Sequence, residues 1–98
     1  MLRLLDMRKI TWSAAKNTVL RKQRNISFEQ LLQAIESGGL VADQKNPARP
    51  DQRRLVVYCS DYIWIAPYVI ETDGTIFLKT AYPSRKLFKR YCDDKKND

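Results

Sequence analysis

Histidine is absent from the 98-residue chain, and cysteine, glycine and proline are scarce, with two, three and four residues. Without histidine, the chain lacks the side chain that most often transfers protons near neutral pH and most often binds zinc. Cys59 and Cys92 belong to no CxxC pattern, so we expect two reduced thiols and neither a disulfide nor a zinc site. The glycines form no phosphate-binding loop.

Long hydrophobic runs and clustered carboxylates are also missing. No stretch approaches the length of a membrane span, and residues 1–6 lack the apolar run of a signal peptide. We therefore expect a cytoplasmic protein with no membrane association. The carboxylates of Asp43, Asp51, Asp61 and Glu71 are isolated along the chain, which makes two-metal catalysis improbable. No metal or other cofactor is expected.

Positive charge is what the chain has in excess. Eighteen Lys and Arg stand against eleven Asp and Glu, which leaves a net charge of +7. This balance favours a polyanionic partner, or merely keeps the protein soluble. The basic residues gather near the amino end, around residues 49–54 and over residues 77–91. The last segment has no acidic residue and contains Lys79, Arg85, Lys86, Lys89 and Arg90.

Two helices are predicted in the first half of the chain. Ser13 can serve as the N-cap of a weakly apolar helix over residues 14–24, in which Ala15 and Val19 would face a core, with Leu20 as a further candidate. Ser27 and the glutamine three residues later form a capping box for the second helix. Its apolar residues recur at i, i+3, i+4 and i+7, and the glycine pair at residues 38–39 ends it.

The rest of the chain predicts a small sheet and one more helix. Period-two patterns and short polar turns indicate an antiparallel meander of three strands, over residues 52–59, 62–71 and 75–82. Two short strands are predicted before it, at residues 9–13 and 40–42. Pro67 indicates that the strand over residues 62–71 lies at an outer edge of the sheet or contains a bulge. A closing helix follows over residues 84–92. We expect one α+β domain over residues 1–92, with the helices on one face of the sheet, and a disordered tail over residues 93–98.

The strands of the meander alternate between aliphatic and aromatic or basic side chains. If the aliphatic set, which includes Leu55, Val57, Ile63 and Ile65, faces the core, the other face carries Arg54, Tyr58, Tyr62, Trp64 and Tyr68, with Lys79 as a further candidate. Aromatic rings interleaved with cations suit RNA, because bases stack on rings while cations meet phosphate. The alternative is that these rings are cross-strand packing pairs. A shift of one residue in register would exchange the two faces.

The turn before the closing helix predicts a phosphate site. Ser84 is a natural N-cap, and Arg85 and Lys86 follow it, although helix dipoles favour acidic residues there. Such departures from local rules often mark function, and the alternative is a solvated first turn. Lys79, Arg85 and Lys86 would hold a reacting phosphate, while Tyr91, or a lysine with lowered pKa, would move protons.

The order of elements and several local strings resemble the BrnT family, toxins of bacterial type II toxin–antitoxin pairs. The resemblance covers residues 12–91. The amino half is similar to the family's W-x-x-x-K-N and [IV]-S-F-E strings, here at residues 12–17 and 26–29. The carboxyl half is similar to its I-S-A-R-K-A segment, here YPSRKL at residues 82–87. Where the family has Lys-His-Gly, this chain has Gln23-Arg24-Asn25, and Arg24 replaces the charge of that histidine but hardly its proton transfer at pH 7.

The resemblance implies a RelE-like fold and a toxin-like, metal-independent endoribonuclease that is neutralised by a small antitoxin encoded beside it. In this hypothesis the catalytic set is Lys79, Arg85, Lys86 and Tyr91. The residues expected to contact RNA are Arg24, Arg53, Arg54, Tyr62, Trp64, Tyr68, Thr80 and Ser84. One alternative is a non-catalytic module that holds nucleic acid or an acidic protein on the same surface. Another is a basic stabilising domain with a protein partner only.

Overall fold

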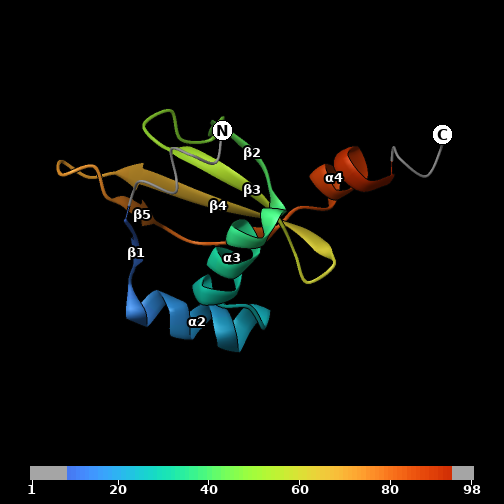
Figure 1. The fold of residues 1–98 in the computed structure, drawn as a ribbon, viewed down its shortest axis with the longest axis horizontal. Helices are drawn as coiled ribbons and strands as arrows, with labels where there is room; N and C mark the ends of the chain where they lie inside the picture. Colours follow the sequence, from blue (N-terminus) through green and yellow to red (C-terminus); the bar gives the residue numbers. More distant parts are fainter. Residues whose placement is uncertain (1–8, 94–98) are drawn as a thin grey trace.

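The computed structural model describes residues 9–93 and shows an α+β arrangement, as predicted (Figure 1). Its strands are β1 (Ile10–Trp12), β2 (Leu40–Lys45), β3 (Arg53–Cys59), β4 (Tyr62–Ile70), β5 (Ile76–Leu78) and β6 (Tyr82–Pro83). Its helices are α2 (Ala14–Arg24), α3 (Phe28–Ala34) and α4 (Arg85–Phe88), with π-helical turns η1 (Ile35–Gly39) and η2 (Lys89–Asp93). Residues 1–8 of the predicted domain and 94–98 of the predicted tail lie outside the described residues. No helix within residues 9–93 is long and apolar enough to cross a membrane.

The six strands form one mixed sheet. Five of them lie in the order β1-β5-β4-β3-β2, and β6 pairs with β4. The pairs from β2 to β5 are antiparallel, as the short turns predicted. The prediction of a wholly antiparallel sheet is wrong, because β1 pairs in parallel with β5, with Ile10 beside Ile76. Turn residues determine the direction of neighbouring strands only, and β1 is separated from β5 by two helices and three strands.

The predicted strand over residues 75–82 is divided into β5 and β6. The break lies beside Pro67 of β4, which has no N–H to donate to a neighbouring strand. The main-chain N–H of Lys79 still donates to the Pro67 carbonyl at 2.8 Å. Residues 79–81 therefore leave the regular ladder while remaining attached to β4.

The helix starts follow the capping pattern of the sequence. Ser13 Oγ accepts a hydrogen bond from the Lys16 N–H at 3.2 Å, which caps α2. Ser27 Oγ accepts from the Gln30 N–H, and Gln30 Oε1 accepts from the Ser27 N–H, so the predicted capping box is confirmed. The chain leaves η1 through Gly38 at φ 94°, a conformation that glycine adopts without a steric penalty.

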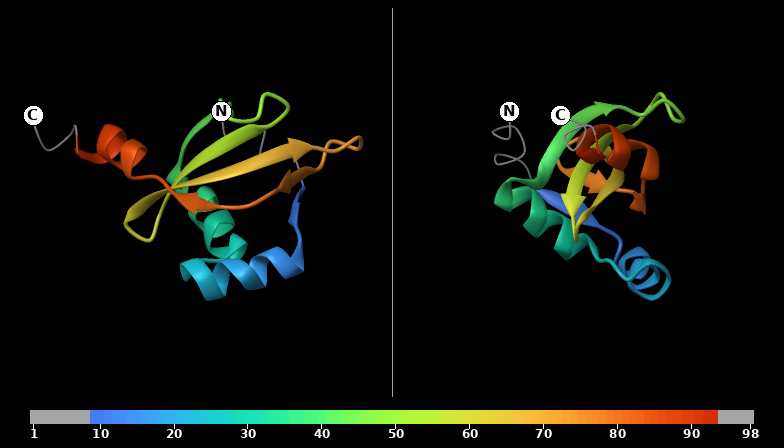
Figure 2. Two further views of the ribbon diagram at one scale, coloured as in Figure 1. Left: turned by 180° about the vertical axis from the view of Figure 1, so that it is seen from behind. Right: turned by 90° about the vertical axis from the view of Figure 1, so that its right-hand side faces the viewer.

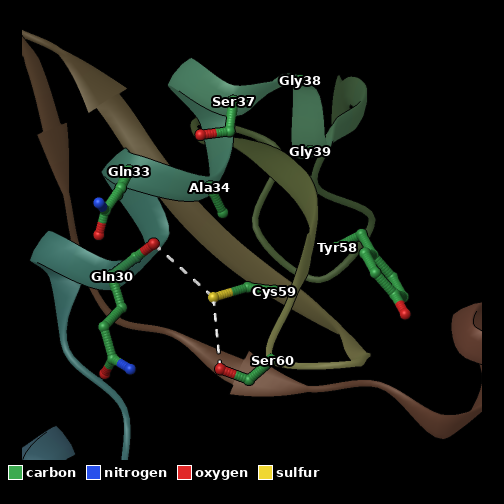
Figure 3. A pocket seen from close by; sticks show the side chains of 9 residues that line it. All are labelled: Gln30, Gln33, Ala34, Ser37, Gly38, Gly39, Tyr58, Cys59 and Ser60. Carbon is green, nitrogen blue, oxygen red and sulfur yellow. Dashed lines mark hydrogen bonds between the residues drawn. The ribbon is translucent and has the colours of Figure 1, made fainter.

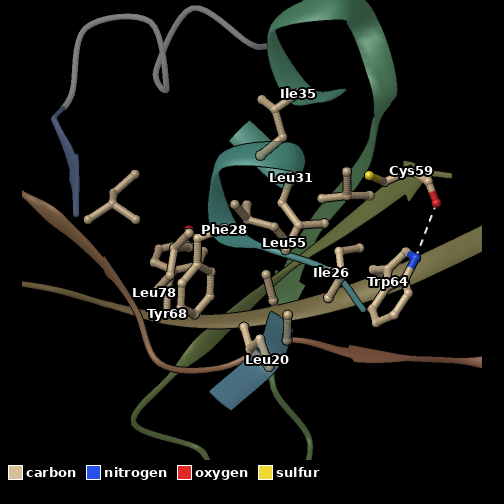
Figure 4. Close-up of a cluster of buried hydrophobic side chains, with 14 residues drawn as sticks. Leu20, Ile26, Phe28, Leu31, Ile35, Leu55, Cys59, Trp64, Tyr68 and Leu78 are labelled. Carbon is tan, nitrogen blue, oxygen red and sulfur yellow. Dashed lines mark hydrogen bonds between the residues drawn. The ribbon is translucent and has the colours of Figure 1, made fainter. Parts of the chain in front are cut away.

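The main core lies between the sheet and the pair α2 and α3 (Figure 4). Phe28 and Leu31 of α3 are fully buried against it, as their spacing predicted. In α2, Leu20 and Asn17 face the core, whereas Ala15 and Val19 are exposed, so the prediction for the latter two is wrong. The core side chains drawn with labels in Figure 4 are Leu20, Ile26, Phe28, Leu31, Ile35, Leu55, Cys59, Trp64, Tyr68 and Leu78.

The aromatic residues of β4 belong to this core. In the β3–β4 register, Leu55 pairs with Ala66 and Val57 pairs with Trp64, so the aromatic set of β4 shares a face with the aliphatic set of β3. Trp64 is 8% exposed, and Tyr68 is 2% exposed. The predicted RNA-facing surface of Trp64 and Tyr68 is therefore wrong, because a buried ring has no face for a base to stack on.

A second, smaller core lies on the opposite face of the sheet. Val56, Ile63 and Ile65 are buried there under Leu87, with Phe88 and Tyr91 packed at the margin. The Phe88 ring also stacks on Tyr62, with ring centroids 4.6 Å apart. The prediction that all helices share one face is wrong, because α4 covers the face opposite α2 and α3 (Figure 2). A strand that is apolar on both sides needs cover on both.

Candidate nucleic-acid interface

A groove of about 380 Å³ lies where three distant segments of the chain meet. Helix α2 contributes Lys16, the β2–β3 loop contributes Arg49, and the segment after β5 contributes Lys79. The other lining residues are Asn46, Ala48, Gln52, Pro67, Thr80 and Tyr82. The lining therefore combines three cations and several hydrogen-bonding groups with no carboxylate.

The β2–β3 loop is held in shape by the buried Asn46. Its Oδ1 accepts a hydrogen bond from the Ala48 N–H at 3.1 Å, and its carbonyl accepts from the Arg49 N–H at 3.2 Å. The Gln52 N–H then donates to the Arg49 carbonyl at 2.9 Å. These bonds close a compact turn and leave the Arg49 side chain exposed beside the groove.

The segment over residues 79–81 brings Lys79 and Thr80 into the groove. Besides the bond from the Lys79 N–H to Pro67, this segment has a contact with α2, because the Arg24 guanidinium donates to the Ala81 carbonyl. The Lys79 side chain is exposed, and its ammonium lies 5.6 Å from the centroid of the Phe77 ring. Nothing acidic among the lining residues neutralises it.

The ion pairs within residues 9–93 lie outside the groove. Arg21 pairs with Glu29 at 3.7 Å, and Arg53 pairs with Asp43 at 3.1 Å. The three groove cations make no ion pair with any residue in the part of the chain that the structure describes. Their charges are available to an anion, and a polyanion such as RNA gains affinity from each phosphate it places near such a cation.

The predicted catalytic set is not gathered in this groove. Lys79 lines it, whereas Arg85 and Lys86 are exposed on α4 and do not. Tyr91 packs at the margin of the second core. Ser84 acts as the predicted N-cap, since its Oγ accepts from the Leu87 N–H at 3.2 Å.

Two of the residues predicted to bind RNA are engaged in a network that joins three strands. Arg53 Nε donates to Asp43 Oδ1 at 3.1 Å, and the Tyr68 hydroxyl donates to both carboxylate oxygens of Asp43, at 2.9 and 3.0 Å. Burial and the hydrogen bond to Asp43 raise the pKa of Tyr68 to about 12. The hydrogen bond to the same carboxylate also raises the pKa of Arg53. These groups fix strand positions and do not line the groove.

The remaining predicted RNA contacts are divided between structural roles and the groove. Arg54 Nε donates to Gln44 Oε1 on the neighbouring strand at 2.8 Å, and Tyr62 is stacked on Phe88. Arg24 contacts the main chain of the groove segment, and Thr80 lines the groove itself. Of the predicted site, the structure therefore brings together Lys79 and Thr80.

The sequence reasoning missed Asn46, Gln52 and Tyr82 as lining residues. Lys16 was recognised as a basic residue of the family-like W-x-x-x-K-N string and Arg49 as a basic residue, but neither was placed in the site, because nothing local shows that they meet in space. The one useful signal was Pro67 within a predicted strand, which marked the irregularity that the groove occupies.

A larger cavity of about 510 Å³ lies between the end of α3 and the β3–β4 turn (Figure 3). Its lining has no charged side chain. Cys59 Sγ lies 3.7 Å from the Gln30 carbonyl and 3.8 Å from Ser60 Oγ, and both Cys59 and Cys92 are free thiols, as predicted. Without cations this cavity is a poorer place for phosphate than the basic groove. No three metal-ligating side chains gather anywhere within residues 9–93.

Comparison with known proteins adds no relative. No protein-family model matches the chain, and neither a curated protein nor a solved structure matches it. The geometry of the groove and the resemblance of the local strings are therefore what support a function.

Proposed function

We propose that the protein is a toxin-like, metal-independent endoribonuclease of a type II toxin–antitoxin pair, and that it binds RNA phosphate in the basic groove. The observation that carries the proposal is the meeting of Lys16, Arg49 and Lys79, from three separate segments, with no carboxylate among the lining residues. Contacts to phosphate supply most of the affinity in sequence-independent nucleic-acid binding.

The groove also offers groups suited to phosphodiester chemistry. In metal-independent cleavage the 2′-oxygen of RNA attacks the adjacent phosphorus, the bond to the 5′-oxygen breaks, and one proton leaves the 2′-hydroxyl while another reaches the 5′-oxygen. Cations beside the phosphate stabilise the extra negative charge of the transition state. Lys79 and Arg49 serve this purpose, and proton transfer without histidine falls to Tyr82 or a groove lysine.

The resemblance to the BrnT family supports the same proposal at two points of the groove. Lys16 belongs to the W-x-x-x-K-N string, and Tyr82 begins the segment similar to I-S-A-R-K-A. The same resemblance supports a RelE-like fold, a cytoplasmic location beside cellular RNA, and a small antitoxin as protein partner.

The second candidate is a non-catalytic module that holds RNA in the same groove. Two observations favour it: histidine is absent, and the predicted catalytic residues Arg85, Lys86 and Tyr91 do not line the groove beside Lys79. If the protein is such a module, RNA should bind with a strong dependence on salt and should not be cleaved.

Induced expression in bacteria separates the two candidates. We expect the wild type to arrest growth and fragment total RNA, and Lys16→Ala/Lys79→Ala to do neither while remaining folded. The matched control Lys22→Ala/Lys45→Ala removes two exposed cations that do not line the groove, and it should arrest growth like the wild type.

Two other results would change the proposed function. Normal growth and intact RNA with folded wild-type protein would favour the binding module. Arrest that persists in Lys16→Ala/Lys79→Ala but is lost in Arg85→Ala/Lys86→Ala would move the phosphate site from the groove to α4.

A further inference from the structure

Arg24 joins two parts of the chain that are far apart in sequence. It is the last residue of α2, and Asn25 after it adopts a left-handed conformation at φ 55° that ends the helix. From this position the Arg24 guanidinium donates a hydrogen bond to the Ala81 carbonyl, 57 residues further along the chain. The Ala81 side chain is fully buried, so the accepting residue is fixed on its other side by the core.

The segment that receives this bond lies outside the regular ladder of the sheet. Residues 79–81 lie between β5 and β6 and belong to neither strand. Its first residue is held by the bond from the Lys79 N–H to the Pro67 carbonyl, and its last by Arg24. Lys79 and Thr80, which line the groove, therefore belong to a segment that is attached at both ends.

We infer that Arg24 is a positioning residue, which holds residues 79–81 so that Lys79 and Thr80 face the groove, and that it does not itself bind phosphate. Arg24 is absent from the groove lining, and its guanidinium is directed to a main-chain carbonyl. Arginine suits this purpose because it stays charged, and a charged donor makes a stronger hydrogen bond than a neutral one. The inference rests on the proposed phosphate site.

The salt dependence of RNA binding distinguishes a positioning residue from a phosphate contact. For single-stranded nucleic acid, log K falls with log salt, and each lost phosphate contact makes that negative slope about 0.7 less steep. The probe is a 2′-O-methylated oligouridylate, which cannot be cleaved through its 2′-oxygen. We expect Lys79→Ala to weaken binding and make the slope about 0.7 less steep. We expect Arg24→Ala to weaken binding roughly threefold to tenfold in the otherwise wild-type chain, but to leave affinity and slope unchanged when Lys79 and Thr80 are already alanine, because a positioning residue acts only through these side chains.

The matched control for charge is Lys22→Ala. Lys22 is also exposed in the last turn of α2, so its replacement removes one positive charge from the same helix end without a contact to Ala81. We expect it to bind like the wild type. A slope that becomes less negative by a further amount of about 0.7 when Arg24→Ala is added to Lys79→Ala/Thr80→Ala would overturn the inference, since it would make Arg24 a phosphate contact in its own right. Wild-type affinity in Arg24→Ala would overturn it as well.

Amide hydrogen exchange tests the attachment without RNA. In Arg24→Ala we expect the Lys79 N–H, which donates to Pro67, to exchange roughly tenfold faster, while the amide of Leu55 in the core keeps its wild-type rate. Arg24→Lys, which retains a charged donor, should restore most of the protection and serves if Arg24→Ala does not fold. An unchanged Lys79 amide would overturn the inference. Failure of the wild type to bind the probe would instead defeat the proposed phosphate site.

Discussion

Replacing Tyr68 with phenylalanine removes one hydroxyl from a network that joins β2, β3 and β4. That hydroxyl donates to both carboxylate oxygens of Asp43, at 2.9 and 3.0 Å, and Arg53 Nε donates to one of them at 3.1 Å. The Tyr68 side chain is 2% exposed, and a phenylalanine ring occupies the same space without leaving a cavity. The change therefore isolates the hydrogen bonds of a single oxygen atom, close to the loop that presents Arg49.

The size of the effect follows from what Asp43 retains. A hydrogen bond to a charged group contributes about 1.5–3 kcal/mol. The Asp43 carboxylate keeps its bond to Arg53, and its side chain is 26% exposed, so water replaces part of the lost interaction. We therefore expect Tyr68→Phe to lower the free energy of unfolding at pH 7 by about 1.5 kcal/mol. For a domain of this size the corresponding fall in Tm is about 6–12 °C.

The pH dependence adds a second test of the same bonds. Because burial and Asp43 raise the pKa of Tyr68 to about 12, the unfolded chain loses this proton first as the pH rises above about 10. The stability that Tyr68 contributes is complete below pH 10 and is lost as the pH approaches 12. The difference between the wild type and Tyr68→Phe should shrink over this range.

Urea unfolding at pH 7 and at several values up to pH 12 measures both effects. Tyr58→Phe is the matched control, because the Tyr58 ring is exposed and its hydroxyl lies 3.3 Å from Asp61. We expect no resolvable change in stability at pH 7 for this variant. A loss in Tyr68→Phe below about 0.5 kcal/mol, or a difference that does not change with pH, would refute the reasoning.

Two further predictions concern the helix pair and the end of η1. Asn17→Ala should lower the free energy of unfolding, measured by thermal unfolding, by about 2–3 kcal/mol. The buried Asn17 amide donates to Glu29 Oε1 and accepts from the Phe28 N–H of α3, each at 2.8 Å, and both bonds are lost. A loss under about 1 kcal/mol would contradict this. Gly39→Ala should be more destabilising than Gly38→Ala. A Cβ at Gly39 would lie 2.6 Å from the Tyr58 carbonyl oxygen, whereas a Cβ at Gly38 would meet no atom within 4 Å and only the positive φ would be strained. Equal losses of stability in the two variants would argue against this crowding.

Features set by near neighbours in the sequence were predictable. The caps at Ser13, Ser27 and Ser84 depend on a hydroxyl and an N–H three residues later, so the residues themselves specify the bond. The turns between β3, β4 and β5 are equally local, and the antiparallel pairing that they imply is confirmed. These features account for the order and approximate bounds of most elements.

The assignment of faces failed at β4, for a physical reason. This strand is buried on both sides, with Ile63 and Ile65 in the second core and Trp64 and Tyr68 in the first. Alternation reveals the solvent face only when one face is polar. Both faces here are apolar, so the contrast between aliphatic and aromatic residues carried no information about exposure.

The groove could be predicted only in part, because its residues meet through tertiary structure. Lys79 and Thr80 were found from their local sequence. Lys16 and Arg49 reach the same place because tertiary structure brings α2 and the β2–β3 loop to Pro67. Neither arrangement leaves a local pattern, in the same way that the parallel partner of β1 left none.

The central claim is that RNA phosphate binds in the groove. The most direct measurement is the affinity of the 2′-O-methylated oligouridylate for the wild type, Lys16→Ala/Lys79→Ala and Arg85→Ala/Lys86→Ala over a range of salt concentrations. The account predicts that the groove variant loses affinity and that its negative slope of log K against log salt becomes less steep by about 1.4, the sum of two phosphate contacts. A groove variant that keeps the wild-type slope, or a wild type that does not bind the probe at low salt, would contradict it.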